Sequence, residues 1–207
     1  MEIATTFQTS ATHYRTERVL GLDIFYRAAG PEHAPVVLLP HGYPTSSFMF
    51  RNLIPLLADT YRVIAPDYPG FGQSSVPNRT DFDYTFDGLG AVMDRFLDQL
   101  GIDQFALYAM DFGAPVGFRL VLAHPERLSA LVLQNAPLYP EPPEGWWETL
   151  GTYWHDGSVQ ARATSRVYLS PESLKNQYLL GVADPSCIDP DTWTLDSALI
   201  ARPGVGR

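Results

Sequence analysis

Several features that would assign this sequence to a special class of protein are scarce or absent. Cys187 is the single cysteine among 207 residues, so an internal disulfide is excluded and a reducing compartment is favoured. The N-terminus has no basic segment followed by an apolar one, and no apolar run is long enough to cross a bilayer. We therefore expect a cytoplasmic protein without a signal peptide and without a membrane partner.

Positive charge is also scarce. Lysine and arginine total 14 against 23 acidic residues, the net charge is −9, and the basic residues form no cluster. Nucleic acids and anionic membranes are therefore not expected as partners. The histidines and acids lack metal-ligand spacing, and neither a phosphate-binding loop nor a dinucleotide fingerprint occurs. We expect chemistry that needs no metal and no cofactor.

The sequence does contain a regular alternation of strand-like and helix-like segments. Hydrophobic residues make up 45% of the chain, enough for a buried core. Apolar runs rich in β-formers predict strands over 19–27, 35–39, 61–65, 105–110 and 128–134. Helical periodicity covers 48–57, 84–100 and a stretch that starts at Gly113 and ends at His124. This order predicts an α/β fold with a mainly parallel sheet, whose functional groups gather at the carboxyl ends of the strands.

The strand that begins at Phe105 ends at one acid, Asp111. Gly113 follows, and Pro115 suits the first turn of a helix, where its missing N–H is not needed. A carboxylate at such a turn faces a helix N-terminus, which favours its ionised form. It can then attack a saturated carbon as a nucleophile. The alternative is that Asp111 only caps the helix, since Asp is a preferred N-cap.

Three motifs together resemble the α/β-hydrolase fold, in the branch that uses an Asp nucleophile. The strand, turn and helix around Asp111 resemble the nucleophile elbow, which carries Ser in the commoner form. Residues 41–44 (His-Gly-Tyr-Pro) are similar to the His-Gly-x-Pro loop of epoxide hydrolases and haloalkane dehalogenases. Residues 67–74 match the family's Asp-x-Pro-Gly-x-Gly-x-Ser turn. The resemblance implies two steps: Asp111 forms an ester with the substrate, and a His-activated water then hydrolyses it.

The resemblance also implies roles for residues close to Asp111. The backbone N–H groups of Tyr43 and Phe112 would form an oxyanion hole. His41 and Pro44 would shape the substrate-binding loop. A role for His41 as a base is the alternative, and we favour the loop-shaping role.

Prolines and aromatic residues dominate the sequence beyond residue 136. This stretch resembles the helical cap that the family inserts into its core domain. We therefore expect an α/β-hydrolase core over residues 1–136 and a helical cap segment over residues 137–207. Trp147 and Trp154 are expected to contact the substrate, although each could instead belong to the core of a helical lid.

Tyrosines of the cap carry a further expectation. In epoxide hydrolases, cap tyrosines protonate the epoxide oxygen as the ring opens. Tyr153, Tyr168 and Tyr178 are candidates in this sequence. We favour Tyr153 and Tyr178 and do not choose between them, and packing in the lid is the alternative for each.

Two positions favour an epoxide over a halide as the substrate. Dehalogenases of the family hold halide with an Asn at the position of Tyr43 and a Trp at that of Phe112, and this sequence has neither donor. We therefore expect a small apolar epoxide. A haloalkane or haloacid dehalogenase and a non-catalytic binding protein are the alternatives.

The base of the second step has no counterpart in the sequence. The five histidines are His13, His33, His41, His124 and His155, and none follows the cap segment, where the family places its base. The last strands of the family's core are also missing. We expect a truncated hydrolase that forms one ester and does not turn over. Its exposed sheet edge should favour self-association.

Overall fold

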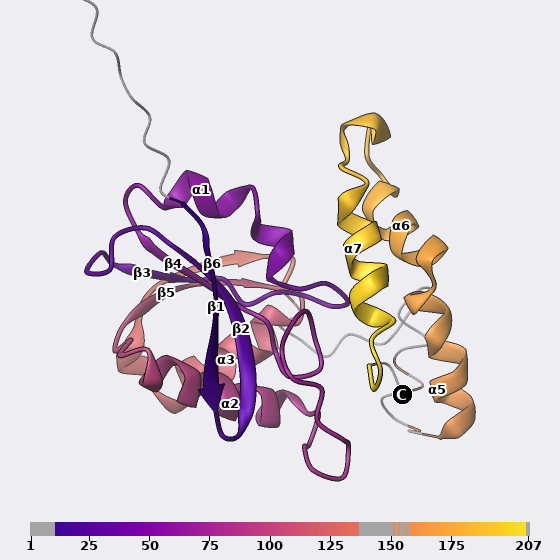
Figure 1. Ribbon diagram of the computed structural model, residues 1–207, viewed down its shortest axis with the longest axis horizontal. Helices are drawn as coiled ribbons and strands as arrows, with labels where there is room; N and C mark the ends of the chain where they lie inside the picture. Colours follow the sequence, from indigo (N-terminus) through magenta and orange to yellow (C-terminus); the bar gives the residue numbers. More distant parts are fainter. Residues whose placement is uncertain (1–10, 137–150, 152, 154–155, 157, 206–207) are drawn as a thin grey trace, which may run out of the picture.

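The central element is a six-stranded sheet in the order β1-β2-β4-β3-β5-β6, seen in a computed structural model that describes residues 11–136, 151, 153, 156 and 158–205 (Figure 1). Strands β1 (His13–Val19) and β2 (Leu22–Ala29) form an antiparallel hairpin beside β4 (Arg62–Pro66). Strands β3 (Val36–Leu38), β5 (Phe105–Met110) and β6 (Leu128–Gln134) continue the sheet in parallel with β4. The predicted α/β fold with a mainly parallel sheet is confirmed.

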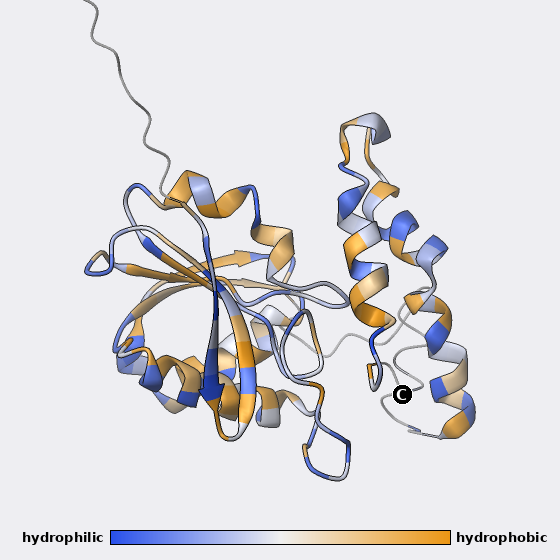
Figure 2. Cartoon of the chain, viewed as in Figure 1, coloured by the Kyte–Doolittle hydropathy of each residue, from blue (hydrophilic) through white to orange (hydrophobic). Residues whose placement is uncertain are grey.

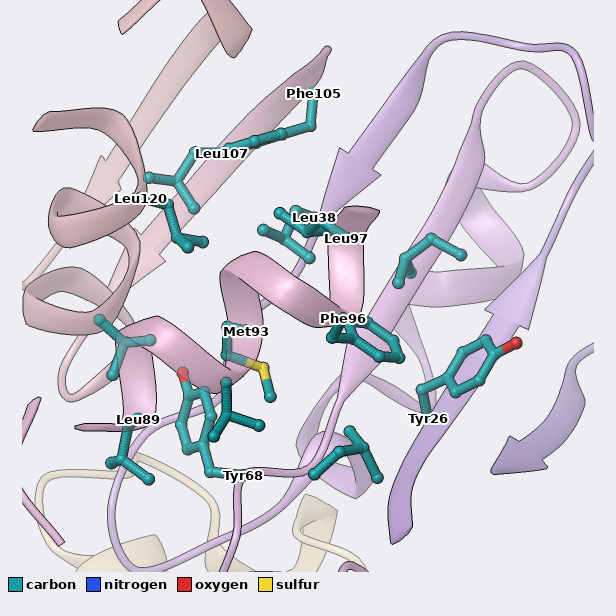
Figure 3. Packing of buried hydrophobic residues seen from close by; sticks show 14 of the residues in the cluster. Tyr26, Leu38, Tyr68, Leu89, Met93, Phe96, Leu97, Phe105, Leu107 and Leu120 are labelled. Carbon is teal, nitrogen blue, oxygen red and sulfur yellow. The ribbon is translucent and has the colours of Figure 1, made fainter. Parts of the chain in front are cut away.

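Helices cover both faces of this sheet. Helix α1 (Leu53–Leu57) lies on one face, and α2 (Phe86–Gln99) and α3 (Gly113–Ala123) lie on the other (Figure 1). Alternate residues of β5 serve the two cores. Phe105, Leu107 and Ala109 pack with α2 and α3, as Figure 3 shows for Phe105 and Leu107. Tyr108 and Met110 pack toward the α1 side. The strand is therefore buried from both sides, as a continuous apolar run predicts.

The helix predicted over residues 48–57 is broken into two pieces. A short 3-10 helix (Ser47–Phe50) is followed by α1, with Arg51 and Asn52 between them. Pro55 explains the break, because in a continuous helix its ring would clash with the carbonyl of Arg51, four residues earlier. The prediction over 84–100 fits better, since Thr85 caps α2 and Gly101 follows its end with φ of 62°.

Three helices from the C-terminal part lie beside the sheet (Figure 1). They are α5 (Val159–Ser165), α6 (Pro171–Leu179) and α7 (Asp191–Ile200). Arg51 holds α7 to the sheet domain, donating to Thr192 Oγ1 at 2.8 Å and to Asp189 Oδ2 at 3.3 Å. The predicted boundary at residue 137 and both Trp147 and Trp154 lie outside the described residues.

Strand β6 forms one edge of the sheet and is unusually exposed for an apolar strand. Leu131, Val132 and Leu133 are 43%, 51% and 46% exposed, and the strand carries mainly the hydrophobic colour in Figure 2. Within the described residues, no helix has both the length and the apolar character needed to cross a bilayer.

Candidate active site

Asp111 lies directly after β5, in a backbone conformation that non-glycine residues seldom adopt, with φ of 40°. Its carboxylate oxygen Oδ1 accepts hydrogen bonds from the backbone N–H of Tyr43 and from that of Phe112, both at 2.7 Å. In the described part of the chain, Oδ2 has no hydrogen-bond partner. One oxygen is thus held between two donors, and the other has no such partner among the described residues.

The helix-cap alternative for Asp111 does not match this geometry. Phe112 is the N-cap residue of α3, and the Asp111 side chain bonds the N–H groups of Phe112 and Tyr43. A capping carboxylate would instead accept from an N–H group two or three residues further along. The Asp111 side chain therefore joins two loops and does not cap the helix.

Close backbone contact brings the two loops together. A Cβ atom on Gly113 would lie 2.1 Å from the carbonyl oxygen of Pro40, and one on Gly42 would lie 2.9 Å from Asp111 Cβ. Only residues without side chains allow this approach. The approach carries the N–H of Tyr43 to the carboxylate.

His41 is fully buried behind the loop and is not among the described residues that line the cavity. Its Nδ1 donates to the carbonyl of Gly42 at 2.8 Å, and its Nε2 accepts from the N–H of Tyr68 at 3.3 Å. Burial lowers the pKa of His41. The ring is neutral with both nitrogens engaged, which suits support of the loop. Pro44 does line the cavity.

A cavity of about 730 Å³ opens between the sheet domain and the C-terminal helices. Asp111, Tyr43 and Phe112 line it from the sheet side, and Tyr153, Leu169, Leu199 and Ile200 line it from the other side. The rings of Tyr43 and Phe112 contact each other with centroids 5.2 Å apart. Burial, reinforced by nearby Tyr153, raises the pKa of Tyr43 to about 12, so its hydroxyl stays protonated.

The candidate tyrosines differ in position. Tyr153 lines the cavity, and its hydroxyl accepts a hydrogen bond from Arg79 Nη2 at 3.4 Å. This bond is the main reason that the pKa of Tyr153 is lowered. Neither Tyr168 nor Tyr178 is among the described residues that line the cavity. The hydroxyl of Tyr178 donates to Asp196 Oδ2 at 2.5 Å. Burial first, and then Asp196, raises the pKa of Tyr178.

The sequence interpretation missed a set of basic residues on the cavity wall. Four arginines contribute to its lining: Arg79, Arg119, Arg162 and Arg166. Arg79 and Arg119 are far in the sequence from each other and from the other two, so the four do not form a charge cluster in the sequence. The available signal was the four-residue spacing of Arg162 and Arg166. The described residues contain no group of three or more His, Cys, Asp or Glu that could hold a metal ion.

Comparisons with known proteins agree with this architecture. The α/β-hydrolase fold family matches residues 35–164. An uncharacterized hydrolase of Saccharomyces cerevisiae is 42% identical over 188 residues, which cover 89% of this chain and 64% of that protein. A haloalkane dehalogenase of Bradyrhizobium diazoefficiens is 35% identical over 160 residues, covering 76% and 50%.

Solved structures give the same relation. The crystal structure of an epoxide hydrolase from Vigna radiata superposes with a TM-score of 0.74 and 26% identity, covering 94% of this chain and 70% of that one. The chain thus spans 64% and 50% of the length of these two curated relatives.

Proposed function

Because this chain belongs to the α/β-hydrolase fold family, we propose that it opens small apolar epoxides through an ester formed on Asp111. The observation that carries the proposal is the Asp111 carboxylate, with Oδ1 held by two N–H groups and Oδ2 without a partner among the described residues. Tyr153 lines the same cavity, and in this proposal it is the proton donor. The dehalogenase alternative has less support, because Tyr43 and Phe112 present rings packed on each other where dehalogenases have halide donors.

The first step uses both walls of the cavity. Oδ2 of Asp111 attacks a carbon of the epoxide, the C–O bond to that carbon breaks, and its electron pair moves to the epoxide oxygen. The hydroxyl of Tyr153 donates its proton to that oxygen. The products of this step are a hydroxyalkyl ester on Asp111 and a Tyr153 phenolate, which Arg79 stabilises by its hydrogen bond.

The second step uses the same two N–H groups. The ester keeps Oδ1 as its carbonyl oxygen, between the N–H groups of Tyr43 and Phe112. Water that attacks this carbonyl places negative charge on Oδ1, where two donors stabilise it. No histidine lines the cavity among the described residues, so we propose that the 207-residue chain hydrolyses its ester slowly or not at all.

Intact-protein mass spectrometry after incubation with styrene oxide tests the function directly. We expect a gain of one substrate mass, mapped by peptide sequencing to Asp111 and stable for hours. Rapid multiple turnover without a detectable ester would contradict the proposed slow second step. Absence of label on Asp111 would contradict the proposed nucleophile.

The role of Tyr153 predicts a pH dependence. Labelling should fall as pH rises through the pKa of Tyr153, which Arg79 lowers from its usual value of 10.0, because the phenolate has no proton to donate. Tyr153→Phe should slow labelling by roughly 10²-fold, and Arg79→Met should move the fall to higher pH. The measurement is the labelling rate between neutral and alkaline pH.

Tyr178→Phe is the matched control for this pH profile. The Tyr178 hydroxyl is bonded to Asp196, and Tyr178 is not among the described residues that line the cavity. The labelling rate of this variant should therefore still fall at alkaline pH. If the labelling rate of Tyr178→Phe no longer fell at alkaline pH, or if that of Tyr153→Phe still did, the proton donor would be a group other than Tyr153.

We also propose that the chain self-associates through β6. This edge strand exposes Leu131, Val132 and Leu133 and has no charged residue to oppose pairing with a second chain. Val132→Lys should give a monomer at concentrations where the unmodified chain associates, as measured by sedimentation velocity. Val159→Lys, at a residue that is 85% exposed on α5, is the control and should leave association unchanged. Association that persists in Val132→Lys would rule out this edge.

A cytoplasmic setting is part of the proposal. Cys187 is free and exposed, and such a thiol persists most readily in a reducing compartment.

A further inference from the structure

The cavity wall opposite the sheet carries two arginines on one helical face. Arg162 lies in α5, and Arg166 follows four residues later, at the start of the 3-10 helix Arg166–Leu169. Both line the cavity. Like charges at this spacing repel each other and weaken a helix. Helix stability therefore does not explain why both arginines face the same space.

These arginines have no acidic partner in the described part of the chain. An acidic residue lies within ion-pair distance of each of five other arginines: Arg18, Arg51, Arg95, Arg119 and Arg127. Among the described residues, no such contact exists for Arg79, Arg162 or Arg166. The Nε atom of Arg162 is buried without a hydrogen-bond partner there.

The acids of the cavity are already engaged. Asp87 forms an ion pair with Arg119. Asp196 accepts hydrogen bonds from Thr45 and Tyr178, and Asp111 accepts from two backbone N–H groups. The positive charge on this wall is therefore not neutralised by the acids that share the cavity.

We propose that Arg162 and Arg166 bind a carboxylate of the substrate, so that the preferred epoxide carries an acid group. This inference rests on the proposed function and narrows its substrate class from apolar epoxides in general to apolar epoxides that also carry a carboxylate. Guanidinium groups match the planar carboxylate and form charge-assisted hydrogen bonds with it. The net charge of −9 means that such an anion is drawn to this wall locally and not to the protein surface as a whole.

The position of Tyr153 links the arginines to the reacting atoms. The pKa of Tyr153 is lowered first by the hydrogen bond from Arg79 and further by the charge and a hydrogen bond of Arg162, so Arg162 lies beside the Tyr153 hydroxyl. Tyr153 and Asp111 line the same cavity. An epoxide between Asp111 and Tyr153 therefore has its carboxylate within reach of the arginine wall. Phe86 and Leu89 offer apolar lining for the remainder of the substrate.

The test compares two epoxides that differ only in charge, 3-phenylglycidate and 3-phenylglycidamide. At low ionic strength, the unmodified chain should be labelled by the glycidate at least about tenfold faster than by the amide. Arg162→Gln and Arg166→Gln should each bring this ratio close to unity, whereas Arg95→Gln, at an exposed pair on α2, should keep it. A ratio of one or below in the unmodified chain, or a ratio that both cavity variants preserve, would overturn the proposal.

Binding of an unreactive acid separates this inference from the proposed function. Calorimetry with cinnamate and cinnamamide should show tighter binding of cinnamate, and both cavity variants should lose that preference. If neither epoxide labels Asp111 while this pattern holds, the nucleophile proposal fails and the carboxylate site stands. If Asp111 is labelled but cinnamate is not preferred, the carboxylate site fails and the nucleophile stands.

Discussion

Asp111→Asn is expected to reduce labelling by styrene oxide by roughly 10⁴-fold or more, the scale of loss when a nucleophile is removed. An asparagine retains the carbonyl oxygen that the N–H groups of Tyr43 and Phe112 bind at 2.7 Å. The atom that replaces Oδ2 is then an amide nitrogen, whose lone pair is delocalised and which attacks carbon poorly. The shape of the site is preserved while its reactivity is lost.

Asp103→Asn provides the matched control, because Asp103 is exposed in the loop before β5. It makes the same chemical change away from the cavity and should label at the rate of the unmodified chain. The measurement is the time course of mass gain for the three proteins side by side. An Asp111→Asn protein that labels within tenfold of the unmodified chain would require a different nucleophile.

Gly113→Ala is expected to destabilise the protein by about 3 kcal/mol, at the upper end of ordinary overpacking. The added Cβ would lie 2.1 Å from the carbonyl oxygen of Pro40, an atom of the backbone that cannot rotate away. The elbow and the loop after β3 would have to separate. Urea unfolding should show the loss as a lower midpoint, and labelling should fall as well, since the N–H of Tyr43 moves with that loop.

Gly90→Ala separates this clash from the general effect of replacing glycine in a helix. Gly90 lies in α2, where an added Cβ would meet the Arg119 side chain at 3.1 Å. The nearest atom is Arg119 Cβ, and a shift of a few tenths of an ångström between α2 and α3 relieves the contact. Alanine favours a helix by up to about 1 kcal/mol, so the midpoint should change little. An unchanged midpoint in Gly113→Ala would show that the two loops tolerate separation.

The fold was predictable because its signals are local. Apolar runs predicted β2 to β6, although the segment predicted over 19–27 also includes the end of β1 and the turn between β1 and β2. The motifs anticipated that residues 41–44 would meet Asp111 at the carboxyl ends of β3 and β5. In the structure, Tyr43 and Phe112 donate to the Asp111 carboxylate. The prediction of one helix over 48–57 was wrong. Its hydrophobic periodicity is helical, but the ring of Pro55 would clash with the carbonyl of Arg51 in a continuous helix.

The rest of the cavity depends on contacts that sequence order does not reveal. Tyr153 and Tyr178 were equivalent as cap tyrosines, yet Tyr153 lines the cavity and Tyr178 bonds Asp196. Arg79 and Arg162 are 83 positions apart in the sequence but line the same cavity. Such groupings arise only when helices from distant segments pack together.

The attachment of α7 couples this helix to the loop that holds the Asp111 carboxylate. Asp196 of α7 accepts from Thr45 at 3.2 Å, and Thr45 follows Tyr43 closely on the loop whose N–H holds Asp111. A shift of α7 would therefore displace Thr45 and, with it, the loop that carries the N–H of Tyr43.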